Sequence, residues 1–194
     1  MIHHSKQLWV LIAGLGLLGI ALWQTNEASD TIPPGVSPSA SSFSWQNTPQ
    51  NSQVNVEFTN DVQELNRYLN RHPDDTEHWI QLGNLLFDNG NFADAVKPYT
   101  EALRLQPENP DVRTDLGVCL FNTGMNDEAI LQFERALQYA PDHITATFNL
   151  GIVHARMGRT QSAVQYWRKT IRLGPDTDMG KKATRALTDA GYKP

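Results

Sequence analysis

The feature that most constrains the fold of this chain is an internal repeat with a period of 34 residues. Four kinds of residue recur at this spacing: a Leu-Gly pair, an alanine, an aromatic residue and a proline. They lie at Leu82-Gly83, Leu116-Gly117 and Leu150-Gly151; at Ala95, Ala129 and Ala163; at Tyr99, Phe133 and Trp167; and at Pro107, Pro141 and Pro175. A period of roughly 20–50 residues predicts a stacked array in which each unit buries its apolar face only against its neighbours.

These recurring residues resemble the tetratricopeptide repeat (TPR) family, whose motif runs Trp-x-x-Leu-Gly-x-x-Tyr, then Ala-x-x-x-Phe, then Pro. The first unit has Trp79 at the head of the motif, whereas the second has Arg113 there and the third has Thr147. The resemblance implies an all-α fold, a TPR superhelical solenoid with three full repeats near residues 76–109, 110–143 and 144–177 and with flanking helices. It also favours a binding scaffold over an enzyme.

Each TPR unit has two antiparallel helices, which we call helix A and helix B. The expected A helices cover residues 77–88, 111–122 and 144–157, and the expected B helices cover residues 92–105, 126–139 and 160–173. Residues 58–71 fit helix B of an incomplete repeat, and residues 177–190 are expected to cap the last repeat by shielding its apolar face. The recurring aromatic residues are expected to fill the space between repeats, while the glycines and alanines allow close packing.

An unbroken apolar run covers residues 8–23, inside an uncharged stretch from residue 7 to residue 26. A helix of about 20 residues spans about 30 Å, the thickness of the hydrocarbon core of a bilayer. Trp9 and Trp23 bracket the run as interfacial aromatics do, and Lys6 before it places the N-terminus in the cytoplasm. We therefore expect residues 1–26 to be a transmembrane anchor, with the TPR domain on the extracytoplasmic side. The alternative is a cleaved signal peptide, which exports the same domain.

Residues 27–56 are rich in Ser, Pro, Asn, Gln and Thr and show no hydrophobic periodicity. Such a segment cannot bury enough apolar surface to offset its ordering entropy. We therefore expect a disordered linker between the anchor and a TPR domain over residues 57–194.

The sequence lacks the motifs that mark common catalytic and cofactor sites. It has no serine nucleophile elbow, no glycine-rich phosphate loop and no His-Glu-x-x-His segment. Cys119 is the single cysteine, and His72 and His78, which flank a loop, are interpreted as surface histidines rather than metal ligands. The net charge of −5 argues against general nucleic-acid binding. We expect no enzyme activity, no cofactor, no metal, no nucleic acid and no small-molecule substrate.

In the TPR family helix A lines a concave face, and the resemblance therefore points to a partner-binding groove. The positions that match are Ile80, Asn84 and Phe87 in the first repeat, Thr114, Val118 and Phe121 in the second, and Phe148, Asn149 and Ile152 in the third. Their largely apolar character predicts a groove for a protein or peptide partner. The alternative is that some of them pack against neighbouring helices.

Some TPR co-chaperones hold a C-terminal carboxylate in a clamp of Lys, Asn and Arg. The corresponding positions here carry Ile80, Asn84, Asp115, Thr145 and Asn149, so the cations are missing and this partner class is disfavoured. Charge is also split along the array: residues 57–153 carry 6 basic and 16 acidic side chains, whereas residues 154–194 carry 9 basic and 3 acidic ones. An acidic body with a basic end is polar enough to orient a partner.

Together these patterns describe a bacterial-type, single-pass membrane protein that displays a TPR domain. The function that they favour is a protein-binding scaffold or assembly adaptor at the membrane. The stretch 65–75, with Trp79 and Leu82-Gly83, is similar to TPR subunits of the cytochrome c maturation machinery, which bind the apocytochrome chain. The alternative from another class is a structural subunit of a larger envelope complex, such as a pilus or a secretion apparatus.

Overall fold

The computed structural model describes residues 49–193, with side chains from residue 56 onward. These residues form eight helices and no strand. The helices are α1 (Pro49–Leu69), α2 (Thr76–Asp88), α3 (Phe92–Leu105), α4 (Pro110–Asn122), α5 (Asn126–Tyr139), α6 (Ile144–Arg156), α7 (Thr160–Leu173) and α8 (Asp178–Asp189). They belong to one compact unit that covers Asn47–Pro194.

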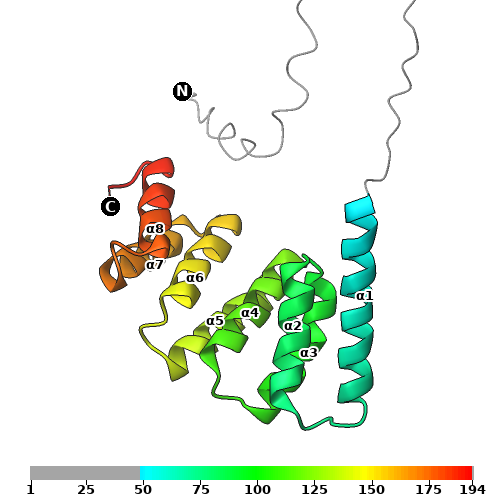
Figure 1. Ribbon diagram of the computed structural model, residues 1–194. Coiled ribbons are helices and arrows are strands. Elements are labelled where there is room, and N and C mark those ends of the chain that lie inside the picture. Colours follow the sequence, from blue (N-terminus) through cyan, green and yellow to red (C-terminus); the bar gives the residue numbers. More distant parts are fainter. Residues whose placement is uncertain (1–48, 194) are drawn as a thin grey trace, which may run out of the picture. The chain divides into compact units, whose positions relative to one another are not determined.

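The eight helices stack in chain order, each packing mainly against the next one along the sequence (Figure 1). Helices α2 and α3, α4 and α5, and α6 and α7 are the A and B helices of the three repeats. The expected helical solenoid is therefore confirmed, and the B helices α3, α5 and α7 have the predicted bounds. The A helices differ from the prediction by one residue at one end.

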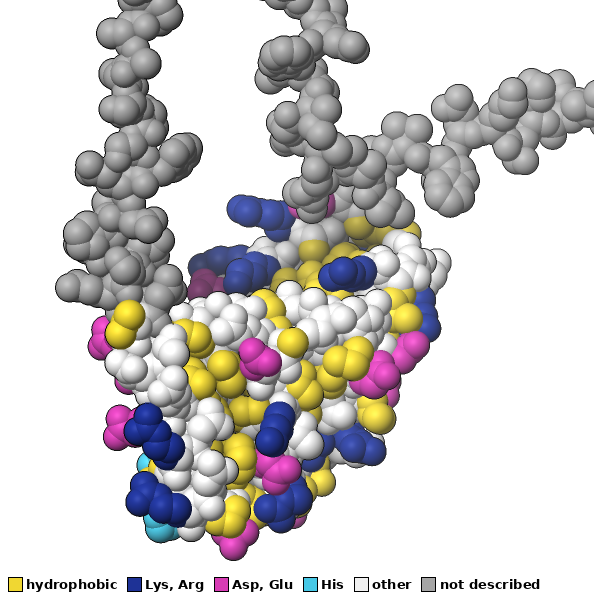
Figure 2. Space-filling view, turned by 90° about the vertical axis from the view of Figure 1, so that its right-hand side faces the viewer, with side chains coloured by type: hydrophobic (Ala, Val, Ile, Leu, Met, Phe, Trp, Pro, Cys, Tyr) yellow, Lys and Arg dark blue, Asp and Glu magenta, His cyan; other side chains and the backbone are white. Residues whose placement is uncertain are grey.

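Helix α1 begins at Pro49 rather than at residue 58, so its first turns lie in the stretch that the composition assigned to the linker. Proline suits the first turn of a helix, because the amide that it lacks has no partner there in any case. Gln, Asn and Ser residues follow Pro49, and each of them lowers the helix propensity of the segment only weakly. The expectation of a disordered linker gave these residues too much weight. Seen from the α1 side, the surface mixes hydrophobic, acidic and basic side chains (Figure 2).

The expected membrane anchor at residues 1–26 lies outside the described residues, as does the linker up to residue 48. Between residues 49 and 193, no helix is both long enough and apolar enough to cross a bilayer. The anchor therefore stays a prediction from the sequence.

The helix starts show a regularity that the sequence analysis did not use. The N-cap residues Asp75, Asn109, His143 and Thr177 recur every 34 residues, and each side chain accepts a hydrogen bond from the backbone N–H three residues later. Capping residues of this kind satisfy amides that have no partner inside the helix, at about 1 kcal/mol each. The turn after helix A uses Gly90 at φ 74°, with Gly124 and Gly158 in the same conformation in the next repeats. A positive φ suits glycine because it has no Cβ.

The glycine of helix A lies against the aromatic ring of helix B in the same repeat. A Cβ on Gly83 would come 2.6 Å from Cε1 of Tyr99, and a Cβ on Gly117 would come 2.5 Å from Cε1 of Phe133. The third repeat makes the same contact between Gly151 and the Trp167 indole. The aromatic residues therefore fill the space inside each repeat, between its own two helices.

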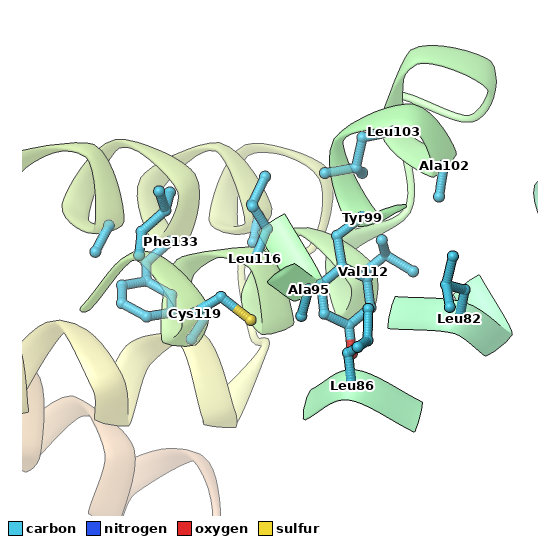
Figure 3. Close-up of a cluster of buried hydrophobic side chains, with 14 of the residues drawn as sticks. Leu82, Leu86, Ala95, Tyr99, Ala102, Leu103, Val112, Leu116, Cys119 and Phe133 are labelled. Carbon is cyan, nitrogen blue, oxygen red and sulfur yellow. The ribbon is translucent and has the colours of Figure 1, made fainter. Parts of the chain in front are cut away.

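A larger apolar core runs through the first two repeats and into α6, and a smaller one joins α7 to α8. Figure 3 shows the larger core around Tyr99, Leu116 and Phe133. The smaller core contains Ala163, Val164, Trp167, Ala183 and Leu187. Because Ala183 and Leu187 of α8 are fully buried there, α8 covers the last repeat as expected.

Candidate functional site

The predicted groove residues come from the three A helices, α2, α4 and α6. The six apolar ones are all partly buried: Ile80, Phe87, Val118, Phe121, Phe148 and Ile152. The first four of them pack on the edge of the larger core, and the last two pack on the edge of the smaller core. Each therefore turns one side to the core and keeps another side accessible to solvent, so packing and surface exposure occur together.

The three polar positions of the predicted groove differ from one another. Asn84 is exposed, and its Oδ1 accepts a hydrogen bond of 2.9 Å from the Tyr99 hydroxyl. Its Nδ2 makes no hydrogen bond with a described residue, which leaves a donor for a ligand carbonyl. Asn149 is half-buried.

Thr114 does not belong to the accessible surface. Its side chain is only 2% exposed, and its hydroxyl donates a hydrogen bond of 2.8 Å to the Pro110 carbonyl one turn earlier. A threonine in a helix can satisfy its hydroxyl in this way, so it is easily buried. The expectation that Thr114 lines the groove is therefore corrected.

The positively charged side chain of Arg156 lies over Phe121, the central aromatic residue of the predicted groove. The guanidinium carbon of Arg156, at the end of α6, is 4.8 Å from the ring centroid of Phe121 on α4. Such a contact is worth about 0.5–1 kcal/mol when it is exposed to solvent. The predicted groove therefore has a guanidinium group, which can donate several hydrogen bonds, beside an apolar ring.

Acidic groups lie on the same helix α4. Nε2 of His143 is 2.8 Å from Oδ1 of Asp111, while Nδ1 of His143 accepts the Ala146 amide. This pattern fits a neutral imidazole that carries its proton on Nε2. Desolvation, reinforced by the nearby charge of Asp111, raises the pKa of Asp115 to about 6. The second repeat therefore presents carboxyl groups next to its apolar side chains.

The two histidines and the cysteine that the sequence analysis singled out each pack against neighbouring residues of the fold. The Tyr68 ring lies 4.5 Å from the His72 ring and 4.0 Å from the His78 ring, between centroids. His78 Nδ1 is also 2.9 Å from Oδ2 of Asp75, whose pKa this contact lowers to about 2. Cys119 is completely buried, and burial raises its pKa to about 12. Its thiol is therefore a packing group.

Sequence reasoning missed the Arg156–Phe121 contact and the Tyr99–Asn84 hydrogen bond. The repeat register offered a signal for the first contact. Arg156 comes directly after the position that corresponds to Phe121 one repeat later, so the two residues lie at matching heights on neighbouring A helices. The second had none, since it depends on how far the Tyr99 ring reaches past Gly83.

Comparison with solved structures supports the fold. A crystal structure of MamA has a TM-score of 0.61 at 20% identity, and the match covers 76% of this chain and 88% of that one. The TPR domain of Arabidopsis OM64 has a TM-score of 0.56 at 20% identity, with coverage of 59% and 95%. At this identity the likeness concerns the helical arrangement alone. No curated protein matches the sequence.

A family model for the TPR domain of cytochrome c-type biogenesis protein H matches residues 44–180. The matched segment begins just before α1 and extends into α8, so it includes every A helix described above. It also agrees with the similarity to cytochrome c maturation subunits that the sequence suggested. This chain therefore belongs to the cytochrome c-type biogenesis protein H TPR family.

Proposed function

We propose that this protein is an assembly adaptor that binds a protein partner on the face formed by α2, α4 and α6. The observation that carries the proposal is the row of six partly buried apolar side chains, which recur on all three A helices. Isolated exposed apolar residues are normal, but a row that continues over several elements is typical of an interaction surface.

The chemistry of this face favours a peptide segment with apolar side chains. Phe121 and Phe148 offer ring surface, and burying one such ring against a partner contributes on the order of 1.5–3 kcal/mol. Asn84 offers an amide donor for a backbone carbonyl of the partner. The carboxyl groups of α4 add a preference for a segment that carries basic residues.

The family membership supports a particular client, the polypeptide of a c-type cytochrome before haem attachment. A chain in that state exposes the apolar residues that later surround the haem. An adaptor with an apolar, hydrogen-bonding face holds such a segment without needing a cofactor of its own. The extracytoplasmic side of a membrane is the compartment that we propose for this encounter, with residues 1–26 as the anchor and residues 27–48 as part of the tether.

Binding of a fluorescently labelled, haem-free cytochrome c polypeptide tests the proposal. Phe121→Ala should weaken binding by about tenfold to a hundredfold, because the ring lies near the middle of the face. Leu131→Ala is the matched control: Leu131 is 43% exposed and lies on α5, a B helix, so binding should not change.

Phe121 also touches the core, and its removal could lower stability. Helical circular dichroism and the melting temperature must therefore be measured for both variants. Phe148→Ala, on the smaller core, provides a second removal of ring surface from the same face. The proposal fails if well-folded Phe121→Ala and Phe148→Ala variants bind the polypeptide as tightly as the unaltered chain does.

A further inference from the structure

Helix α1 corresponds to helix B of a repeat whose helix A is missing from residues 49–193. Leu65 of α1 occupies the position of the aromatic residues Tyr99, Phe133 and Trp167, and it is buried with 9% of its surface exposed. In each complete repeat the residue at this position packs against the glycine of its own helix A. At the N-terminal end of the described solenoid, α1 instead leaves an open groove between itself and α2.

This groove is a cavity of about 570 Å³. Its lining includes the apolar surfaces of Leu65, Tyr68 and Leu85 and two carboxylates of α1, Asp61 and Glu64. The other lining residues, His78, Gln81 and Asn84, come from α2. Asp61 and Glu64 are exposed, and neither forms an ion pair with a residue that the structure describes. The groove therefore combines apolar surface with uncompensated negative charge.

The opposite end of the solenoid carries the complementary charge. Helix α8 exposes Lys181, Lys182 and Arg185 within about one helical turn, and none of them forms an ion pair among the described residues. Tyr192 follows the helix and is 38% exposed, which makes it one of the few large side chains with an uncovered apolar surface. Helices α1 and α8 lie at opposite ends of the stack (Figure 1).

The charge of the whole array follows the same division. Residues 57–153 have a net charge of −10, from 6 basic and 16 acidic side chains, and residues 154–194 have +6, from 9 basic and 3 acidic ones. Two copies in head-to-tail order bring the basic end of one to the acidic end of the other. A side-by-side pair in the same direction places like charges next to each other.

We propose that this protein self-associates head to tail, with the basic α8 end of one copy seated on the acidic α1–α2 groove of the next. Lys181 and Lys182 of one copy face Asp61 and Glu64 of the other, and Tyr192 supplies the apolar contact with the lining of the groove. Such a contact is heterologous, so both ends of each copy stay in use and the assembly grows beyond a dimer unless it closes into a ring. The groove shares only Asn84 with the A-helix face, and the proposal does not depend on the client named above.

The experiment uses the full chain in a non-ionic detergent, with molar mass measured by sedimentation velocity. The unaltered chain should form oligomers at low salt, and the oligomers should dissociate as salt screens the charges at the contact. The variant Asp61→Asn/Glu64→Gln neutralises the acidic end, and the variant Lys181→Gln/Lys182→Gln neutralises the basic end. Each variant alone should associate at least about tenfold more weakly than the unaltered chain.

Mixing the two variants gives the decisive result. One retains a working basic end and the other a working acidic groove, so an equimolar mixture should contain species no larger than a dimer that holds one copy of each. The matched controls are Glu128→Lys and Arg135→Glu on α5, which reverse exposed charges far from both ends and should leave the oligomers intact.

Three outcomes overturn the proposal. The unaltered chain could stay monomeric at low salt, both end variants could associate as strongly as the unaltered chain, or the mixture could fail to form dimers. Association that persists in both end variants belongs to another surface, such as the N-terminal apolar run, which both variants retain. A haem-free cytochrome c polypeptide that binds normally to both variants shows that the A-helix face is intact whatever the oligomeric state.

Discussion

At the scale of single residues, the backbone carbonyl of the proline that precedes each A helix shows how different side chains make the same hydrogen bond. Trp79 Nε1 donates to the Pro73 carbonyl at 2.9 Å, and Arg113 Nη2 donates to the Pro107 carbonyl at 2.6 Å. Thr147 is too short to do the same in the third repeat. There Lys169 Nζ, from the B helix, donates to the corresponding Pro141 carbonyl at 3.0 Å. The departures from the TPR motif at Arg113 and Thr147 are therefore compensated by hydrogen bonding.

Arg113→Met should lower the free energy of unfolding by about 1–3 kcal/mol, because a partly buried carbonyl loses its donor. Arg113 is only 7% exposed, and it also donates to Gln132 Oε1 at 3.0 Å. Arg113→Trp should lose less than Arg113→Met, since Trp79 reaches the equivalent carbonyl. Urea unfolding followed by circular dichroism measures both variants. Equal stability of Arg113→Met and the unaltered chain would show that this hydrogen bond contributes nothing.

Asp115→Asn should stabilise the protein at neutral pH. Burial raises the folded-state pKa of Asp115 to about 6, well above the value of an exposed aspartate. The folded state therefore binds the proton more tightly than the unfolded state does, and this contribution to stability is full below about pH 4 and is lost as the pH rises through about 6. The asparagine side chain does not ionise, so the variant does not lose this stability as the pH rises. Its free energy of unfolding should exceed that of the unaltered chain by about 1–3 kcal/mol at pH 7.5, and the difference should vanish near pH 4.

Urea midpoints measured between pH 4 and pH 8 test the aspartate prediction. Asp142→Asn is a suitable control, because Asp142 lies in an exposed turn and its replacement should change the midpoint little. A constant difference between Asp115→Asn and the unaltered chain over the whole pH range would mean that titration of Asp115 is not the cause.

At the scale of helices, each element depends on its sequence neighbours, because α1 to α8 pack mainly in chain order. Such an array is stabilised by nearest-neighbour interfaces, and its end elements have only one partner. Helix α8 shows what an end element does: Ala183 and Leu187 are buried against α7, while its lysines face solvent. Trp167 of α7 stays only 5% exposed because α8 covers the core around it.

Removal of residues 176–194 should expose the apolar face of α7 and lower the melting temperature, with aggregation on heating. Burial of a leucine-sized side chain contributes on the order of 1.5–3 kcal/mol, and Leu187 alone loses that much. Light scattering and helical circular dichroism follow the two effects. Removal of residues 193–194 alone is the control, because it leaves α8 in place. A chain without α8 that melts and stays soluble like the unaltered chain would show that α8 is not a cap.

At the scale of the whole molecule, we propose that residues 1–26 hold the TPR domain at a membrane. The structure describes residues 49–193, so this proposal rests on the uncharged stretch 7–26 and on its flanking residues. The domain follows the stretch after a segment that carries several prolines and few apolar residues.

The chain should remain in the membrane fraction after an alkaline wash, and its TPR domain should be digested when protease reaches the extracytoplasmic side. Protection of the domain under those conditions would reverse the orientation. A soluble mature chain that begins near residue 22 would mean that the segment is a cleaved signal peptide. Replacing Leu15 and Leu18 with lysines should abolish membrane retention and leave the helical content of the TPR domain unchanged.

Much of the fold could be predicted because the same pattern recurs in three repeats, and it indicates both where the helices lie and which residues pack together. The positions of Gly83, Gly117 and Gly151 and of their aromatic partners follow one 34-residue register, so a helix assigned in one repeat is supported by two others. This is why α3, α5 and α7 have the predicted bounds. The start of α1 at Pro49 was missed because that segment has no repeat register to compare with.

The sequence by itself determined the helical class, the number of repeats and the helix faces, because periodicity records which residues share an environment. Only the tertiary structure decided what each environment is. Thr114 and Val118 lie on the same helix, yet Thr114 is buried and Val118 stays partly exposed. The Phe121–Arg156 contact, the donors to the three proline carbonyls and the open groove beside α1 likewise depend on distances between helices. A pattern along one chain contains no such distances, because they arise only when side chains of particular sizes pack against one another.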